Sequence, residues 1–202
     1  MVPIMACSFV SLAVVYDRWC AFRENRKIDT RALRSKVQAH LRAGNIDAAI
    51  SECAATGGPV ASVMLAGLRS YQQLREKNES PDTMRAVITQ VMEEYSVQAL
   101  SLVNKRLDVL TVVGTAAPLL GMTGTVTGMI GSFGGMAEAG ASGGGGAVAA
   151  GIAEALITTA AGLLIALSAV IPQSMYNRWS DEIELEMQEA NSEIIEFILT
   201  HH

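Results

Sequence analysis

Residues 109–137 read VLTVVGTAAPLLGMTGTVTGMIGSFGGMA and decide the fold, because they contain no charged residue. This uncharged run is longer than the roughly 20 residues that a helix needs to cross a bilayer core. It is not plain hydrocarbon, since hydroxyls recur along it. On an ideal helix, one sector of about 80° collects Thr111, Thr115, Pro118, Met122 and Thr125. We therefore predict a transmembrane helix over 107–135 that packs in a bundle and turns one mildly polar face toward something more hydrated than lipid.

Glycines are the second feature of this segment, and they recur at Gly121, Gly124, Gly128 and Gly131. Gly124 and Gly128 form a GxxxG pair, a motif that lets another backbone approach closely in lipid. We expect Pro118, Gly121, Gly124 and Gly128 to serve helix packing.

A third apolar segment spans 151–176, with Glu154 as its single charge. Small residues recur along it at helical spacing: Ala155, Thr159, Gly162, Ala166 and Ala169. They predict a second packing face that carries one hydroxyl, with Gly162 at its centre. Glu154 and Thr158 lie roughly 140° and 100° from Thr159 on an ideal helix, so they need not share its neighbours.

The distribution of charge predicts the orientation in the membrane. Half of all residues are hydrophobic, 17% are charged and the mean hydropathy is +0.30, which is typical of membrane proteins. All 15 lysines and arginines lie between Arg18 and Arg106, except Arg178. The positive-inside rule then places residues 17–108 and the tail 177–202 in the cytoplasm. The glycine-rich loop 136–150 and the N-terminus are expected to be periplasmic.

Residues 1–22 are expected to form the first transmembrane helix. The uncharged run ends at Tyr16, and sixteen helical residues cover about 24 Å, less than a hydrocarbon core of about 30 Å. Either the helix extends through Asp17–Phe22 at the interface, with Tyr16 and Trp19 as interfacial aromatics, or residues upstream are missing.

The cytoplasmic segment 23–106 reads as helices separated by turns at Gly44-Asn45, at 56–59 and at 77–82. From Pro81 onward no helix breaker follows, so we expect one helix that continues into the central span. The tail 177–202 is an acidic amphipathic helix whose apolar stripe we interpret as core between neighbouring tails. The stripe consists of Ile183, Met187, Ala190, Ile194 and Phe197.

Several kinds of chemistry are not supported by the sequence. Cys7, Cys20 and Cys53 show no metal-ligand spacing, and their odd number implies no disulfide framework. The glycine-rich loop lacks the GK[ST] ending of a phosphate-binding loop. No nucleophile–base pair is recognisable, so we expect no enzyme, no cofactor, no metal and no nucleic-acid partner. No titratable residue lies at mid-depth of a span, so an ion path would need a carboxylate from a partner helix.

Two segments resemble the MotA/TolQ/ExbB proton-channel family, and they are closer to its ExbB/TolQ branch than to flagellar MotA. They read PLLGMTGTVTGMIGSF over 118–133 and GIAEALITTAAGLLIALSAVIPQ over 151–173. Their shared pattern is APLLG-x-x-GTV-x-G followed by GIAEAL-x-x-T-x-x-G-L. Two departures are the extra threonine at Thr158 and the short N-terminus.

This resemblance implies an all-α membrane protein of the bacterial inner membrane, with three transmembrane helices and long cytoplasmic helical extensions. It also implies a homopentamer that encloses a dimer of an ExbD/TolR-like protein, whose membrane helix brings an aspartate. Thr125 and Thr159 match the family's pore threonines, Glu154 matches its pore-side glutamate, and Thr158 adds a hydroxyl to the pathway. The proton motive force would then drive work at the cell envelope through a TonB- or TolA-like protein.

Other functions were weighed against this motor. A secondary transporter would need an inverted repeat, which three spans cannot hold. A non-conducting scaffold that organises a partner helix fits the residue chemistry nearly as well. The alternative for each small or hydroxyl-bearing residue is a role in helix packing alone, which is the commonest role of such residues in membrane bundles. We prefer that interpretation for Thr127, Thr158 and Ser168, and the pathway interpretation for Thr125 and Thr159.

Overall fold

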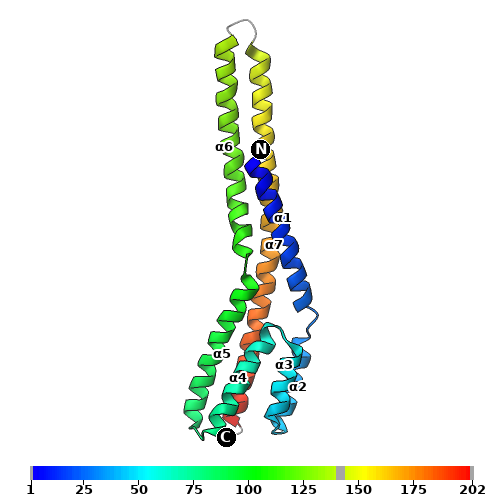
Figure 1. Cartoon of the computed structure of the whole chain (residues 1–202), viewed down its shortest axis with the longest axis vertical. Helices are drawn as coiled ribbons and strands as arrows, with labels where there is room; N and C mark the ends of the chain where they lie inside the picture. The colour runs from blue at the N-terminus through cyan, green and yellow to red at the C-terminus, as the bar shows by residue number, and fades with distance from the viewer. Residues whose placement is uncertain (1, 140–143, 201–202) are drawn as a thin grey trace. The chain divides into compact units, whose positions relative to one another are not determined.

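The computed structural model of the chain describes residues 2–139 and 144–200, which form helices and no strand. The all-α prediction is therefore confirmed for this part of the chain (Figure 1). The helices are α1 (Val2–Asn25), α2 (Thr30–Arg42), α3 (Ile46–Thr56), α4 (Gly58–Glu76), α5 (Pro81–Asn104), α6 (Leu107–Ala139) and α7 (Gly144–Thr200).

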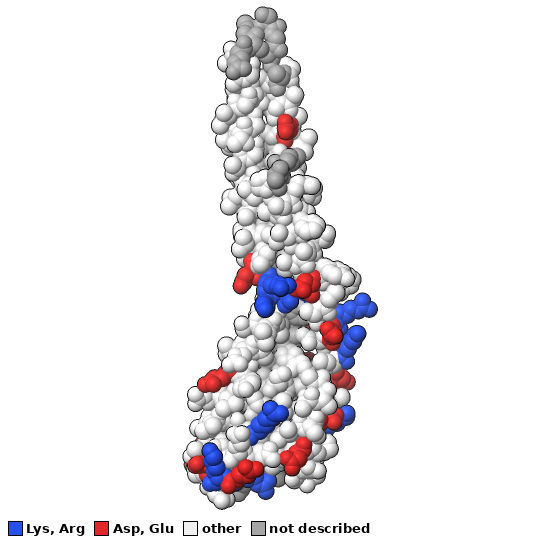
Figure 2. Space-filling view, in the orientation of Figure 1, with Lys and Arg blue, Asp and Glu red and all other residues white. Residues whose placement is uncertain are grey.

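The chain divides into two compact units. Unit 1 comprises Met1–Cys20 and Arg106–Tyr176, and unit 2 comprises Ala21–Lys105 and Asn177–His202. Three of the described helices contain a segment long and apolar enough to cross a membrane, namely α1, α6 and α7. The three predicted transmembrane segments thus coincide with three candidate membrane-spanning helices. Where α6 and the first half of α7 form the surface, Figure 2 shows almost no charged residue.

Unit 1 is built on a hairpin of α6 and the first part of α7, which run side by side in opposite directions (Figure 1). α1 joins this hairpin through polar contacts near its C-terminal end. The Tyr176 hydroxyl donates a hydrogen bond to the Val15 carbonyl at 2.8 Å. The Arg106 guanidinium forms an ion pair with Asp17 at 3.1 Å. These contacts fix where α1 meets the other two apolar helices.

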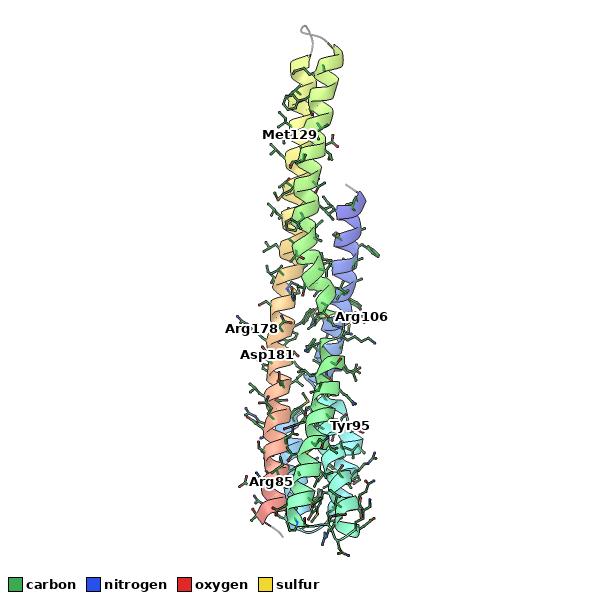
Figure 3. All side chains as sticks on the ribbon, turned by 90° about the vertical axis from the view of Figure 1, so that its left-hand side faces the viewer. Arg85, Tyr95, Arg106, Met129, Arg178 and Asp181 are labelled. Carbon is green, nitrogen blue, oxygen red and sulfur yellow. The ribbon has the colours of Figure 1, made fainter. Side chains whose placement is uncertain are left out.

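The expectation of one unbroken helix from Pro81 through the central span is wrong. α5 ends at Asn104 and α6 begins at Leu107. Between them Arg106, labelled in Figure 3, has φ +71, a left-handed conformation that non-glycine residues rarely adopt. The sequence holds no glycine or proline here to predict the break. The ion pair of Arg106 with Asp17 helps to offset the backbone cost.

The third apolar segment and the tail belong to one continuous helix. α7 continues from Gly144 to Thr200 through Pro172, although proline removes a backbone donor from the helix interior. The predicted loop 136–150 is also too long, since residues 136–139 and 144–150 are helical and only 140–143 lie outside the described residues.

Unit 2 confirms the predicted turns, and side chains cap three of its helices. Asp29, Asn45 and Ser80 each accept a hydrogen bond from the first turn of the helix that follows. Inside the unit, burial of Cys53 raises the pKa of its thiol to about 11. This thiol is therefore part of the core rather than a reactive group.

The apolar stripe of the tail packs within its own chain. Met187, Ala190, Ile194 and Ile198 are buried in the core of unit 2, among residues of α2 to α5. Arg34 of α2 also holds the tail, through an ion pair with Glu193 at 2.6 Å and another with Glu189. These carboxylates raise the pKa of Arg34, with the hydrogen bond to Glu193 as the main cause. The interpretation of the stripe as an interchain core is thus wrong for this structure.

Candidate ion-pathway site

The helices α6 and α7 meet along a line of glycines, which we call the α6–α7 seam. It includes Gly121, Gly124 and Gly128 of α6, and Ala155, Thr158 and Gly162 of α7. A Cβ atom on Gly162 would lie 2.6 Å from the Ala117 carbonyl oxygen, and one on Gly128 would lie 3.0 Å from the Ala155 Cβ. A Cβ atom on Gly124 would overlap the Thr158 methyl group. At these three glycines the opposing helix is so close that a side chain larger than hydrogen would have to displace a neighbouring atom.

The two small-residue faces predicted from the sequence pack against each other in the seam. Both faces were expected to need partner helices, and each finds the other within the same chain. Gly121, Gly124, Gly128 and Gly162 each lie close to atoms of the opposing helix. Pro118 lies inside α6 beside the seam and is half-buried.

The two threonines of the predicted pathway lie on the flank of the seam. Thr159 donates a hydrogen bond from Oγ1 to the Gly121 carbonyl across the seam, at 3.1 Å. Thr125 donates to the Met122 carbonyl of its own helix at 2.6 Å. Both side chains are partly exposed.

Helical geometry brings these two threonines to the same flank. Thr125 lies about 40° beyond Gly121 around α6, and Thr159 lies about 40° beyond Ala155 around α7. Because the two helices run in opposite directions, the same rotation about each helix axis turns both side chains toward one edge of the contact. We call this side of the hairpin the hydroxyl edge. It continues through Thr111, whose Oγ1 accepts a hydrogen bond from Gln173 Nε2 at 2.5 Å.

The other two predicted residues are not on this edge. Glu154 is exposed and precedes Ala155 by about 100° around α7, which places it on the opposite flank of the seam. Thr158 lies in the seam itself, buried against Gly124, with its hydroxyl donating to the Glu154 carbonyl at 2.9 Å. The structure thus brings Thr125 and Thr159 to one edge and separates Glu154 and Thr158 from them.

Sequence reasoning missed two polar residues of the hairpin. Ser132 is buried in α6 and donates to the Gly128 carbonyl at 2.8 Å, near the Gly128–Ala155 end of the seam. Gln173 donates to Thr111 beyond the opposite end of the seam. The signal for Gln173 was available, because an amide in an otherwise apolar segment usually has a hydrogen-bonding partner.

The hydroxyl edge can bind a carboxyl group but holds none. Its threonine hydroxyls use their donor for a backbone carbonyl or, at Thr111, accept from an amide, and their remaining lone pairs can still accept. Among residues 2–139 and 144–200, no group of three or more His, Cys, Asp or Glu side chains could hold a metal ion. The edge therefore offers hydrogen bonds rather than a titratable carrier.

Comparison with known proteins gives a consistent result over most of the chain. Residues 55–189 match the MotA/TolQ/ExbB proton channel family. The chain is 29% identical to the Tol-Pal system protein TolQ of Pseudomonas aeruginosa over 92% of its own length and 78% of that protein. It is 28% identical to the biopolymer transport protein ExbB of Neisseria gonorrhoeae, over 87% of this chain and 83% of the relative. It is also 33% identical to TolQ of Haemophilus influenzae, over 69% and 60% of the two chains.

Proposed function

The chain belongs to the MotA/TolQ/ExbB proton channel family, and on this premise we propose that it works as an ExbB/TolQ-like subunit of a motor in the bacterial inner membrane. In this proposal the proton motive force acts through the chain and an ExbD/TolR-like partner. The energised work is transport or another process at the cell envelope, reached through a TonB- or TolA-like protein.

One observation carries this proposal, namely a row of hydroxyls beside the seam with no carboxylate on the same edge. A proton path at mid-depth needs a titratable group, and such groups in membrane segments mark ion paths. We propose that a partner helix inside a pentamer presents its aspartate to the hydroxyl edge. Thr125 and Thr159 would then contact this aspartate, whereas Glu154, on the opposite flank of the seam, would lie away from it.

The bond between Thr159 and Gly121 suggests how the hydroxyl responds to the charge of the aspartate. A protonated carboxyl group is a donor, so it can bond to the free lone pairs of Oγ1 while Thr159 keeps its bond to Gly121. An ionised carboxylate is an acceptor, so Thr159 must turn its hydrogen away from the carbonyl to reach it. Loss of the proton is thereby linked to a rotation of one hydroxyl.

The proposed topology can be tested by cysteine labelling. With the native cysteines replaced by alanine, a membrane-impermeant thiol reagent should label Gly145→Cys in intact cells. It should label Asp181→Cys only after the cells are opened, because basic residues keep that side in the cytoplasm. Both positions are exposed. If only Asp181→Cys is labelled in intact cells, the topology is the opposite of the one proposed.

The proposed pentamer is tested by its mass. We expect native mass spectrometry in mild detergent to show a homopentamer without the partner protein. The seam is satisfied within one chain, so the interchain contacts must use other surfaces, such as the exposed apolar residues of α6. Leu119, Val126 and Ile130 are among these. A monomer or dimer that persists at all protein concentrations would contradict the proposed ring.

A scaffold without conduction remains the second candidate, since one observation favours it. The hydroxyls of Thr125, Thr158 and Thr159 already donate to backbone carbonyls, as packing residues would. A scaffold would hold the partner helix against the same edge but would pass no protons. Proton flux in the reconstituted complex separates the two functions.

A further inference from the structure

A cavity of about 270 Å³ lies within unit 2, between the end of α1, the start of α4 and the middle of α7. Its volume is just below the range of about 300–1,000 Å³ that is usual for pockets of drug-sized ligands, so it suits a small polar group. Phe22 and Ile183 contribute apolar walls, and Asn25 and Thr30 contribute polar ones. This cavity is separate from the hydroxyl edge, which lies in unit 1.

One positive and two negative side chains line this cavity. The Arg26 guanidinium lies over the Trp179 ring, 5.4 Å from its centroid, which holds the cation by a cation–π contact. Glu182 and Glu186 are the two carboxylates of the lining. Among the described residues, the side chains of Arg26, Glu182 and Glu186 form no ion pair. Their opposite signs in one cavity match a ligand that carries both a negative and a positive group.

Along the chain, the residues that line the cavity follow closely after two apolar segments. Phe22 follows the apolar run of α1 by a few residues, and Trp179 follows Tyr176 by three residues, about 4.5 Å along a helix. The headgroup layer on each side of the bilayer core is about 5–8 Å thick. Tryptophan is enriched at this level, and arginine with an apolar stem suits it as well.

From these observations we propose that the cavity binds the headgroup of phosphatidylethanolamine. Arg26 binds the phosphate through charge-assisted hydrogen bonds, and Glu182 and Glu186 accept hydrogen bonds from the primary ammonium group. Two carboxylates against one guanidinium disfavour the net negative headgroup of phosphatidylglycerol. A quaternary ammonium, as in phosphatidylcholine, has no hydrogen to donate to the carboxylates. It also finds the face of Trp179 occupied by Arg26.

The test uses Trp179 as the reporter, because the chain has two tryptophans and Trp19→Phe removes the other. The full chain is placed in phosphatidylcholine nanodiscs, and a second lipid replaces phosphatidylcholine stepwise. We expect Trp179 fluorescence to change saturably with phosphatidylethanolamine and to change little with phosphatidylglycerol. An equal response to both lipids would overturn the proposal. The readout does not involve proton flux, so it is independent of the proposed function.

Variants assign the response to the charges of the cavity. Arg26→Ala should raise the midpoint of the titration about tenfold to a hundredfold, as expected for the loss of a charge-assisted hydrogen bond. Glu182→Gln with Glu186→Gln should shift the preference toward phosphatidylglycerol. The matched controls are Arg23→Ala and Asp181→Asn, which neutralise neighbouring charges outside the cavity lining and should leave the midpoint unchanged. Asp181 is labelled on α7 in Figure 3.

Two further arms close the test. If Arg26→Ala loses helix content by circular dichroism, Arg26→Lys replaces it, and we expect weaker binding with the same lipid preference, because lysine keeps the charge without the planar fork. An unchanged midpoint in a folded Arg26 variant contradicts the assignment. Soluble glycerophosphoethanolamine is added to pure phosphatidylcholine nanodiscs as the second arm. If it saturates the response as the lipid does, the source is a soluble metabolite and the lipid assignment fails.

Discussion

Thr159→Val is expected to abolish proton flux through the complex while assembly is retained. A carboxylate near the bilayer centre costs about 2.5–3.5 kcal/mol even on the insertion scale. A hydrogen bond to a charged group returns about 1.5–3 kcal/mol of that cost. One charge that crosses 100 mV releases only about 2.3 kcal/mol. A barrier raised by a similar amount would therefore stall turnover.

Proteoliposomes that contain this chain and its single-span partner provide the measurement, with flux followed by a pH-sensitive dye. Thr125→Val should behave like Thr159→Val, and Thr159→Ser should keep part of the flux. Thr127→Val is the matched control, because Thr127 is exposed on the opposite side of α6 and bonds only to its own helix. It should be nearly silent. Wild-type flux in Thr159→Val would reduce this hydroxyl to a packing role.

Thr159→Val also removes the bond across the seam, so a second control is needed. Thr158→Val deletes a neighbouring hydroxyl that is buried in the seam and bonds to its own helix. If both variants lose flux equally, disturbance of the seam explains the loss. If only Thr159→Val loses flux, the position of the hydroxyl on the edge explains it.

Gly162→Ala is expected to cause the largest loss of stability among single-methyl additions to the hairpin. The new Cβ would lie 2.6 Å from the Ala117 carbonyl oxygen and 3.2 Å from the Gly121 Cα, and both are backbone atoms that cannot rotate away. Overpacking of this kind typically costs about 1–3 kcal/mol. The two helices must move apart, which also lengthens the bond from Thr159 to Gly121.

Unfolding in mixed micelles with increasing sodium dodecyl sulfate, followed by circular dichroism, measures this loss. The matched control is Gly131→Ala, because a Cβ on Gly131 meets nothing within 4 Å. Alanine is the better helix former by about 1 kcal/mol, so the control should be neutral or more stable. Equal midpoints for the two variants would contradict the close approach of the backbones at Gly162.

Most of the helices could be predicted from the sequence, since apolar periodicity, caps and glycine-proline turns are local signals. The break at Lys105–Arg106 could not, because it depends on a non-glycine residue in a left-handed conformation and on a distant ion pair with Asp17. The continuity of α7 through Pro172 could not either, because neighbouring packing decides whether a proline ends a helix. At Lys105–Arg106 a tertiary contact accompanies a backbone conformation that local preference does not favour.

The candidate site shows the same limit. Spacing identified small faces on two segments, but it could not say that the faces pack on each other, because small residues signal close contact without naming the partner. Once the seam is known, the angular positions of Thr125 and Thr159 follow from the 3.6-residue repeat. The separation of Glu154 from them follows as well.

Closure of the α6–α7 hairpin within one chain has a kinetic consequence. Its rate is first order and does not depend on how many copies the membrane holds, whereas assembly with other chains depends on their density. A newly inserted chain can therefore bury its glycines before it meets a neighbour. A low expression level would therefore delay assembly with other chains, but the hairpin of each chain would already be closed.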